Sequence, residues 1–187
     1  MIDSFLDKLL RKIRIGKIVK YIAKKNGIIC DVGCGAEPKF LLDLQDLISE
    51  GWGIDKETTT RTWNNKIQTI RRNLDGKISF PFNKNKFDYV TMLATLEHFK
   101  FPKEVLRESW RVLKPKGVLI ITIPSPIAKP ILEFLALLGV ISREEIKDHH
   151  HYYPKKELIS LLKEIGFDNI KHGYFELGFN QRIIAKK

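Results

Sequence analysis

Two glycines and two acids in the first third of the chain have the types and spacing to bind a ligand. Gly33 and Gly35 follow a short apolar run at 28–32 that contains Asp31, and Asp55 closes the next such run. Glycine lets the backbone pass close to a ligand, so a side chain added at Gly33 would enter ligand space. A carboxylate at the end of the neighbouring strand can accept two hydrogen bonds from ribose hydroxyls. The pattern predicts a ligand that carries a ribose; a plain strand-to-helix turn with a solvated or capping Asp55 is the alternative.

Alternating strand and helix patterns must position these residues. Strands are expected at 28–32, 52–55, 66–71, 87–94, 118–123, 169–177 and 181–185, and helices at 39–49, 103–113, 127–139 and 155–165. Such alternation predicts an α/β fold with a mostly parallel seven-stranded sheet, helices on both faces and an antiparallel last strand. In such sheets ligands bind beyond the carboxyl ends of the strands. The acids and glycines above fall at those ends.

The chain is strongly basic, with a net charge of +11. Residues 1–26 carry eight Lys or Arg against two acids, and Phe5, Leu9, Ile13, Ile18 and Ile22 give this segment the spacing of an amphipathic helix. The charge favours acidic partners such as nucleic acid, anionic lipid or a phosphorylated substrate. A solvated helix face is an equally good interpretation.

The sequence gives no sign of membrane insertion or of a disulfide framework. The apolar stretch at 127–141 is interrupted by Lys129 and Glu133 and is too short to span a bilayer. No signal peptide is expected, because charged residues interrupt the N-terminal segment. Cys30 and Cys34 are the two cysteines, and one of them is expected inside a buried strand. A soluble protein of the reducing cytoplasm is predicted.

Several sequence blocks, in this order, resemble those of class I S-adenosylmethionine-dependent methyltransferases, in particular the small type 11 domain proteins. The blocks lie at 29–35, 53–55, 80–90, 96–98 and 111–117. The resemblance implies a Rossmann-like methyltransferase fold with S-adenosylmethionine as cofactor. It divides a single domain, 1–187, into a basic first helix at 1–26, a cofactor-binding core at 27–124, a helical insertion or acceptor lid at 125–155, and a final helix and strand pair at 156–187.

The same resemblance supplies a set of cofactor-binding residues. Backbone near the glycines and after the fourth strand would meet the methionine part, Asp55 the ribose, and either Asn73 or Asp75 the adenine. The full set is Asp31, Gly33, Cys34, Gly35, Asp55, Lys56, Asn73, Leu74, Asp75, Leu93 and Ala94. Glu37 stands where the family often has a third glycine. A nicotinamide dinucleotide enzyme is the rival interpretation, but its glycine pattern would need a glycine at Pro38.

Methyl transfer from a sulfonium needs alignment of the acceptor and sometimes a base, since the leaving group is already activated. His98, which follows the fourth strand, is the first candidate base, with a loop-holding histidine as the plain alternative. His150 and Tyr153, from the polar and aromatic run at 148–153, are the second. No metal site is expected, because three consecutive histidines cannot easily all face one ion.

The methyl acceptor is open at this level. A small molecule, glycan or lipid precursor is the leading expectation. The apolar segment at 126–141 would then form a wall for a bulky apolar acceptor, or else pack in the core or against a second copy. An RNA methyltransferase that uses the basic first helix is the second hypothesis, and a non-catalytic cofactor-binding subunit is the third. The sequence leaves the oligomeric state undecided.

Overall fold

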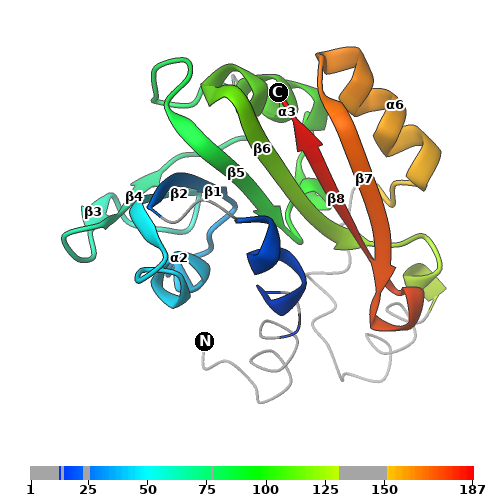
Figure 1. Ribbon diagram of the computed structural model, residues 1–187, viewed down its shortest axis with the longest axis horizontal. Helices are drawn as coiled ribbons and strands as arrows, with labels where there is room; N and C mark the ends of the chain where they lie inside the picture. Colours follow the sequence, from blue (N-terminus) through cyan, green and yellow to red (C-terminus); the bar gives the residue numbers. More distant parts are fainter. Residues whose placement is uncertain (1–12, 14, 23–25, 77, 131–150) are drawn as a thin grey trace.

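The computed structural model describes residues 13, 15–22, 26–76, 78–130 and 151–187. Its centre is one eight-stranded sheet of order β3-β4-β2-β1-β5-β6-β8-β7 (Figure 1). The strands are β1 (Gly27–Val32), β2 (Ile48–Asp55), β3 (Arg61–Thr62), β4 (Ile67–Arg71), β5 (Phe87–Leu93), β6 (Leu113–Pro124), β7 (Asp168–Phe175) and β8 (Asn180–Lys186). The helices that lie wholly within the described residues are α2 (Lys39–Asp43), α3 (Pro102–Val112) and α6 (Lys155–Ile165), with 3-10 turns η1 (Val19–Tyr21), η2 (Leu96–His98) and η3 (Glu176–Gly178).

The predicted fold class is confirmed. Strand β1 pairs in parallel with β2 and β5, and the parallel arrangement continues to β4 on one side and β6 on the other. Strand β8 is antiparallel to both of its neighbours, β6 and β7. The sheet has one more strand than expected, because the two-residue β3 pairs antiparallel with the outer edge of β4.

Helices cover both faces of the sheet. Helices α3 and α6 pack on one face, around fully buried side chains such as Leu106 and Leu162. On the other face α2 and the described N-terminal residues enclose a second cluster that includes Ile18, Phe40 and Ile120. Of the predicted apolar stripe of the first helix, Ile18 and Ile22 are thus buried on the sheet, whereas Phe5 and Leu9 lie outside the described residues.

Two helix predictions need comment. The helix expected at 39–49 ends at Asp43, and β2 begins at Ile48, because a fully buried Ile48 pairs with the start of β1 and extends the sheet. Only 128–130 of the helix expected at 127–139 are described, and they are helical. None of the helices in the described part of the chain has the length and apolar content that a bilayer crossing requires.

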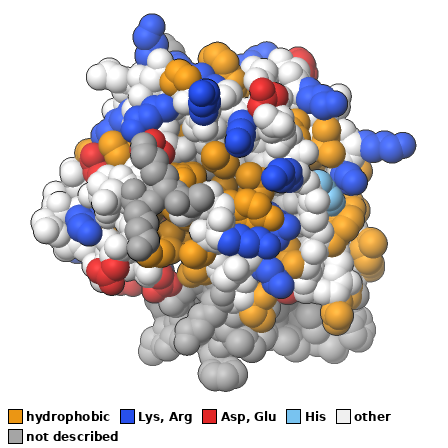
Figure 2. Space-filling model, viewed as in Figure 1, with side chains coloured by type: hydrophobic (Ala, Val, Ile, Leu, Met, Phe, Trp, Pro, Cys, Tyr) orange, Lys and Arg blue, Asp and Glu red, His pale blue; other side chains and the backbone are white. Residues whose placement is uncertain are grey.

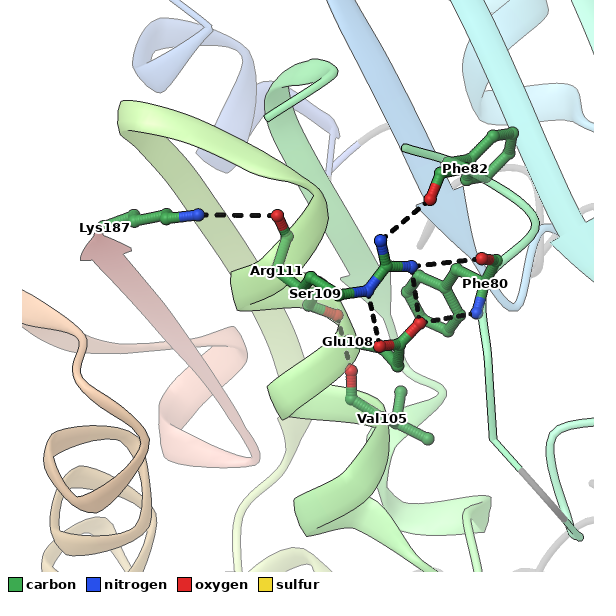
Figure 3. Close-up of polar contacts among 7 residues, drawn as sticks. All are labelled: Phe80, Phe82, Val105, Glu108, Ser109, Arg111 and Lys187. Carbon is green, nitrogen blue, oxygen red and sulfur yellow. Dashed lines mark hydrogen bonds and ion pairs between the residues drawn. The ribbon is translucent and has the colours of Figure 1, made fainter. Parts of the chain in front are cut away.

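The loop that leads into β5 is fastened to α3 by Arg111 (Figure 3). Its guanidinium donates to the carbonyl oxygens of Phe82 at 2.9 Å and Phe80 at 3.1 Å, and binds both carboxylate oxygens of Glu108 at 2.7 Å. The Phe80 amide donates to the same carboxylate at 2.7 Å. Burial alone would raise the pKa of Glu108, but the bonds from Arg111 and from the Phe80 amide outweigh it and lower the pKa. This network joins the sequence blocks at 80–90 and 111–117 in the fold.

We predict that Arg111→Met lowers the free energy of unfolding by about 1–3 kcal/mol, because two carbonyl groups and the Glu108 carboxylate lose their donors. Arg107→Met is the matched control on the same helix. The Arg107 guanidinium is more exposed, and its ion pair with Glu104 is long at 3.9 Å. The free energy of unfolding should therefore change by no more than about 0.5 kcal/mol. Urea denaturation of both variants measures the difference. Equal losses would show that the network does not stabilise the fold.

Candidate functional site

A cavity of about 610 Å³ opens at the carboxyl ends of the central strands. That volume lies within the usual range for a small-molecule site. Residues from the loops after β1, β2, β4 and β5 line it: Gly33, Gly35, Ile54, Asp55, Lys56, Glu57, Arg72, Leu74, Asp75, Ala94, Thr95, His98 and Phe99. The parallel register brings these four loops to one edge of the sheet, as the sequence pattern predicts.

The Asp55 carboxylate ties two of these loops together. One oxygen, Oδ2, accepts from the Gly35 amide at 2.8 Å, and the other, Oδ1, accepts from the Glu57 amide at 2.8 Å. The Asp55 carbonyl oxygen also accepts from the amide of Arg72, which follows β4. A carboxylate offers about four acceptor positions, so this one is fixed in orientation and keeps two positions for a ligand.

The missing side chain of Gly33 makes room for Thr95, and the residue itself lines the cavity. Its φ is +81°, and a Cβ built there would lie 2.3 Å from Thr95 Cγ2 and 2.7 Å from Thr95 Cβ. Thr95 reaches this place because the preceding Ala94 has a left-handed backbone with φ +56°. The Thr95 hydroxyl then donates to the Val32 carbonyl at 3.0 Å. The expectation that a side chain at Gly33 would enter ligand space is therefore wrong. A Cβ at Gly35 would meet only the Glu37 carbonyl, at 3.9 Å.

Asp31 lies beneath the cavity and is not among its lining residues. It is buried, and its Oδ1 accepts from the Thr91 hydroxyl at 2.6 Å. Burial raises the pKa of Asp31 to about 7; the Thr91 bond opposes this shift and the negative charge of Asp55 adds to it. Asp31 therefore holds a proton over much of the acidic range.

The two cysteines are free thiols. Cys34 also stands off the cavity lining, with its sulfur 3.5 Å from the Gly35 carbonyl oxygen. Burial, with the negative charges of Asp31 and Asp55, raises the pKa of the Cys34 thiol far above its usual range. The thiol stays protonated and is therefore a poor nucleophile.

The structure separates the two residues left open for the adenine contact. Asp75 and Leu74 line the cavity, and Leu74 is otherwise buried. The side-chain oxygen of Asn73 accepts from the Asp75 amide at 2.8 Å, which fixes the turn after β4. Asn73 thus shapes the loop that presents Asp75.

The candidate catalytic residues do not come together. His98 lines the cavity, and its amide donates to the Thr95 carbonyl at 3.1 Å. Tyr153 is buried in the core on the α6 side, and burial raises the pKa of its phenol to about 12. His150 lies outside the described residues. Of the three, the structure brings only His98 to the cavity.

Eight of the predicted residues lie on the cavity: Gly33, Gly35, Asp55, Lys56, Leu74, Asp75, Ala94 and His98. Leu93, like Asp31, Cys34 and Asn73, is adjacent to the lining but not part of it. Sequence reasoning missed Ile54, Glu57, Arg72, Thr95 and Phe99. All five are direct neighbours of a predicted residue, so the strand-end positions themselves were the available signal. Among the described residues no group of three metal-ligating side chains gathers.

Comparison with known proteins gives the following relatives. A family model described as a methyltransferase domain matches residues 4–172. An uncharacterised protein of Methanocaldococcus jannaschii is 29% identical over 177 residues, which cover 90% of this chain and 78% of the relative. A ubiquinone/menaquinone biosynthesis C-methyltransferase of Neisseria gonorrhoeae is 26% identical over 162 residues, which cover 70% of this chain and 66% of the relative.

Solved structures share the fold. A methyltransferase in complex with the Haloferax volcanii Trm112 methyltransferase activator superposes with a TM-score of 0.73 at 14% identity, over 96% of this chain and 92% of that one. An S-adenosylmethionine-dependent methyltransferase of Archaeoglobus fulgidus gives 0.70 at 18% identity, over 95% and 93%. At these identities the likeness extends to the fold alone.

We predict that substitutions at Gly33 and Thr95 have non-additive effects on the thermal midpoint of unfolding. Gly33→Ala should lower the thermal midpoint sharply, because its Cβ collides with Thr95 and its backbone is left-handed. Adding Thr95→Ala removes the colliding methyl and hydroxyl groups, so the double variant should regain part of the loss. Gly35→Ala is the control, with a similar φ of +74° and open space. Additive losses in the double variant would contradict the contact.

We predict that Asp31→Asn stabilises the ligand-free protein above pH 7. The pKa of Asp31 is about 7 in the folded chain against 3.8 as the ordinary value. The folded chain therefore binds more protons between these values, and the free energy of unfolding falls as the pH rises through them. The amide still accepts from Thr91 but does not titrate, so this fall should shrink. Exposed Asp46→Asn should leave the profile unchanged. An unaltered pH profile in Asp31→Asn would refute the assignment.

Proposed function

The chain belongs to the family of methyltransferase domains and is an S-adenosylmethionine-dependent methyltransferase; on this premise we propose that its acceptor is a small, largely apolar molecule. The observation that carries the proposal is the wall of the cavity after β5. This wall includes the Phe99 ring, the Thr95 side chain and the His98 imidazole. Such a wall suits a flat apolar molecule with one group to deprotonate.

The residues of the cavity fit the cofactor. Asp55 has two acceptor positions left after its bonds to Gly35 and Glu57, which matches the two hydroxyls of a ribose. We assign the adenine to the side of Leu74 and Asp75, and the methionine part to the backbone of Gly35 and Ala94. The open space at Gly35 supports this, because a Cβ there would point into an unfilled region.

Methyl transfer requires few catalytic groups from the protein. The cofactor, when bound, supplies a methyl group on a sulfonium, whose leaving group is already activated. The loops at the strand ends hold and align the two reactants, which converts a bimolecular encounter into an oriented one. We assign to His98 the removal of the acceptor proton, because it is the imidazole that lines the cavity among the described residues.

The relatives support an apolar acceptor. The similar protein of Neisseria gonorrhoeae is named for ubiquinone and menaquinone biosynthesis, and another, of Caenorhabditis elegans, is a 2-methoxy-6-polyprenyl-1,4-benzoquinol methylase. The chain spans 66% and 40% of the lengths of these relatives, so the acceptor itself remains part of the proposal. A quinol ring fits the combination of Phe99 and His98.

Transfer of radiolabelled methyl groups tests the acceptor class. The purified chain is incubated with S-adenosylmethionine labelled on the methyl group and a cell extract, which is then divided into organic-soluble, small polar, RNA and protein fractions. We expect the label in the organic-soluble fraction, and its loss with His98→Gln. Label confined to the RNA or protein fraction would refute an apolar acceptor while leaving the methyltransferase activity intact.

We predict that Asp55→Ala weakens binding of S-adenosylmethionine at least tenfold. Charge-assisted hydrogen bonds are worth about 1.5–3 kcal/mol each, so the loss of even one exceeds a tenfold change. Asp46→Ala, an exposed acid away from the cavity, is the control and should bind normally. Titration calorimetry measures both, with NAD as a ligand that should not bind. Unchanged affinity in Asp55→Ala would exclude Asp55 as the ribose ligand.

A further inference from the structure

Five cationic side chains gather on the face of the sheet opposite α6. We call Lys17, Lys20, Lys171, Arg182 and Lys186 the basic sheet face. In Figure 1 this face turns toward the viewer, with α6 at the right-hand edge beside β7. Figure 2, from the same side, shows lysine and arginine side chains around a hydrophobic group near the middle, with few acids between them. Four of the five residues are exposed, and Arg182 is half-buried.

Strand register places three of these cations on one face. Arg182, Ile184 and Lys186 alternate along β8 and therefore point to the same side. Lys171 of β7 pairs directly with Ile184, so it shares that side. On the other flank of β8, Ile184 pairs with Ile120, which packs in the same core cluster as Ile18. The face is thus the one on which the N-terminal residues lie.

The N-terminal segment adds the other two cations. Arg182 Nη1 donates to the Lys17 carbonyl at 3.4 Å, and its guanidinium lies 5.1 Å from the centre of the Tyr21 ring. The Lys20 ammonium lies 5.3 Å from the same ring. Tyr21 therefore holds cations from two segments that are far apart in the sequence, and the contacts unite them into one surface.

None of the five cations forms a salt bridge with an acid among the described residues. Five other lysines and arginines of the described residues do form such pairs: Lys86 with Glu50, Lys103 with Glu164, Arg107 with Glu104, Arg111 with Glu108 and Lys114 with Asp88. Asp168, at the start of β7, is the one acid in the three strands β6, β7 and β8, and it pairs in the strand register with Lys186 at the far end of the face. Unbalanced like charges repel one another and attract a polyanion.

We propose that the basic sheet face binds the phosphate backbone of a single-stranded nucleic acid. The surface is broad, and Gly173 pairs with Arg182 and adds no side chain to it, so a chain of phosphates can lie along the strands. A membrane surface fits less well. The exposed large hydrophobic residues of the described chain are Leu47, Phe101, Ile127, Tyr174 and Leu177. Tyr174 pairs with Gln181 and so points to the opposite side of β7, and none of the others lies in the strand rows or helical turn that form this face.

The proposal is independent of the acceptor. The basic sheet face and the cavity are connected through the end of β6, because Arg182 pairs with Thr122, whose carbonyl accepts from the cavity residue Ala94. A bound strand would thus run from the cofactor edge of the sheet toward Lys186. Its role is to place the enzyme on a polyanion, whichever molecule is methylated.

Two triple variants test the proposal on the full chain. Lys20→Gln, Lys171→Gln and Lys186→Gln together remove three charges from the basic sheet face. Lys155→Gln, Lys156→Gln and Lys163→Gln together remove three exposed charges from α6, so this variant has the same net charge as the first variant. The probe is a fluorescein-labelled oligouridylate, followed by anisotropy between about 50 and 200 mM salt. Melting temperature and S-adenosylmethionine affinity confirm that both variants remain folded.

We expect the first variant to bind the oligouridylate at least tenfold more weakly at low salt, and the slope of log affinity against log salt to fall by about 2. The α6 variant should stay within twofold of the unaltered chain. Equal losses in the two variants would show an effect of net charge alone and overturn the proposal. So would binding of the unaltered chain to vesicles of phosphatidylcholine and phosphatidylserine but not to the oligouridylate.

Discussion

The hydrogen bond from the Gly35 amide to the Asp55 carboxylate joins the turn after β1 to the end of β2, and the cavity depends on it. The neighbouring backbone reinforces this link, because the amides of Gly33 and Cys34 both donate to the Ile54 carbonyl. On the other side Asp55 is bonded to the start of the loop after β4. The carboxylate of Asp55 fixes the loops after β1 and β2, and its backbone carbonyl fixes the loop after β4, before any ligand arrives; this is the preorganisation that a binding site requires.

The placement of charge follows from the same carboxylate. Asp31 lies close enough for its pKa to respond to Asp55, and burial disfavours a second anion there. The raised pKa lets the buried Asp31 hold a proton over much of the acidic range, whereas Asp55 lies at the cavity surface. Thr91 completes this arrangement, since a hydroxyl can bond to either form of Asp31.

The sequence predicts those features that depend on neighbours along the chain. Strand ends, the glycine turn and Asp55 follow from apolar runs and their boundaries, and so do the parallel sheet and the antiparallel β8. Contacts between distant segments do not follow. Nothing near Gly33 indicates that Thr95 fills the space above it, and nothing in the basic N-terminal segment indicates that Arg182 lies beside Lys17. That Asp75 lines the cavity while Asn73 bonds within the turn also required the turn geometry.

The order of the strands carries a consequence for synthesis. Strand β8 follows β7 in the chain yet lies between β6 and β7, so neither of those strands has its partner on that side until β8 has left the ribosome. Strand β6 is almost wholly buried from Val118 onward in the finished sheet, and during synthesis its edge stands open. An open apolar edge pairs readily with other chains. The yield of folded protein should therefore depend on how long the edge of β6 stays unpaired before β8 is synthesised. Slow codons before Asn180 would lengthen that interval.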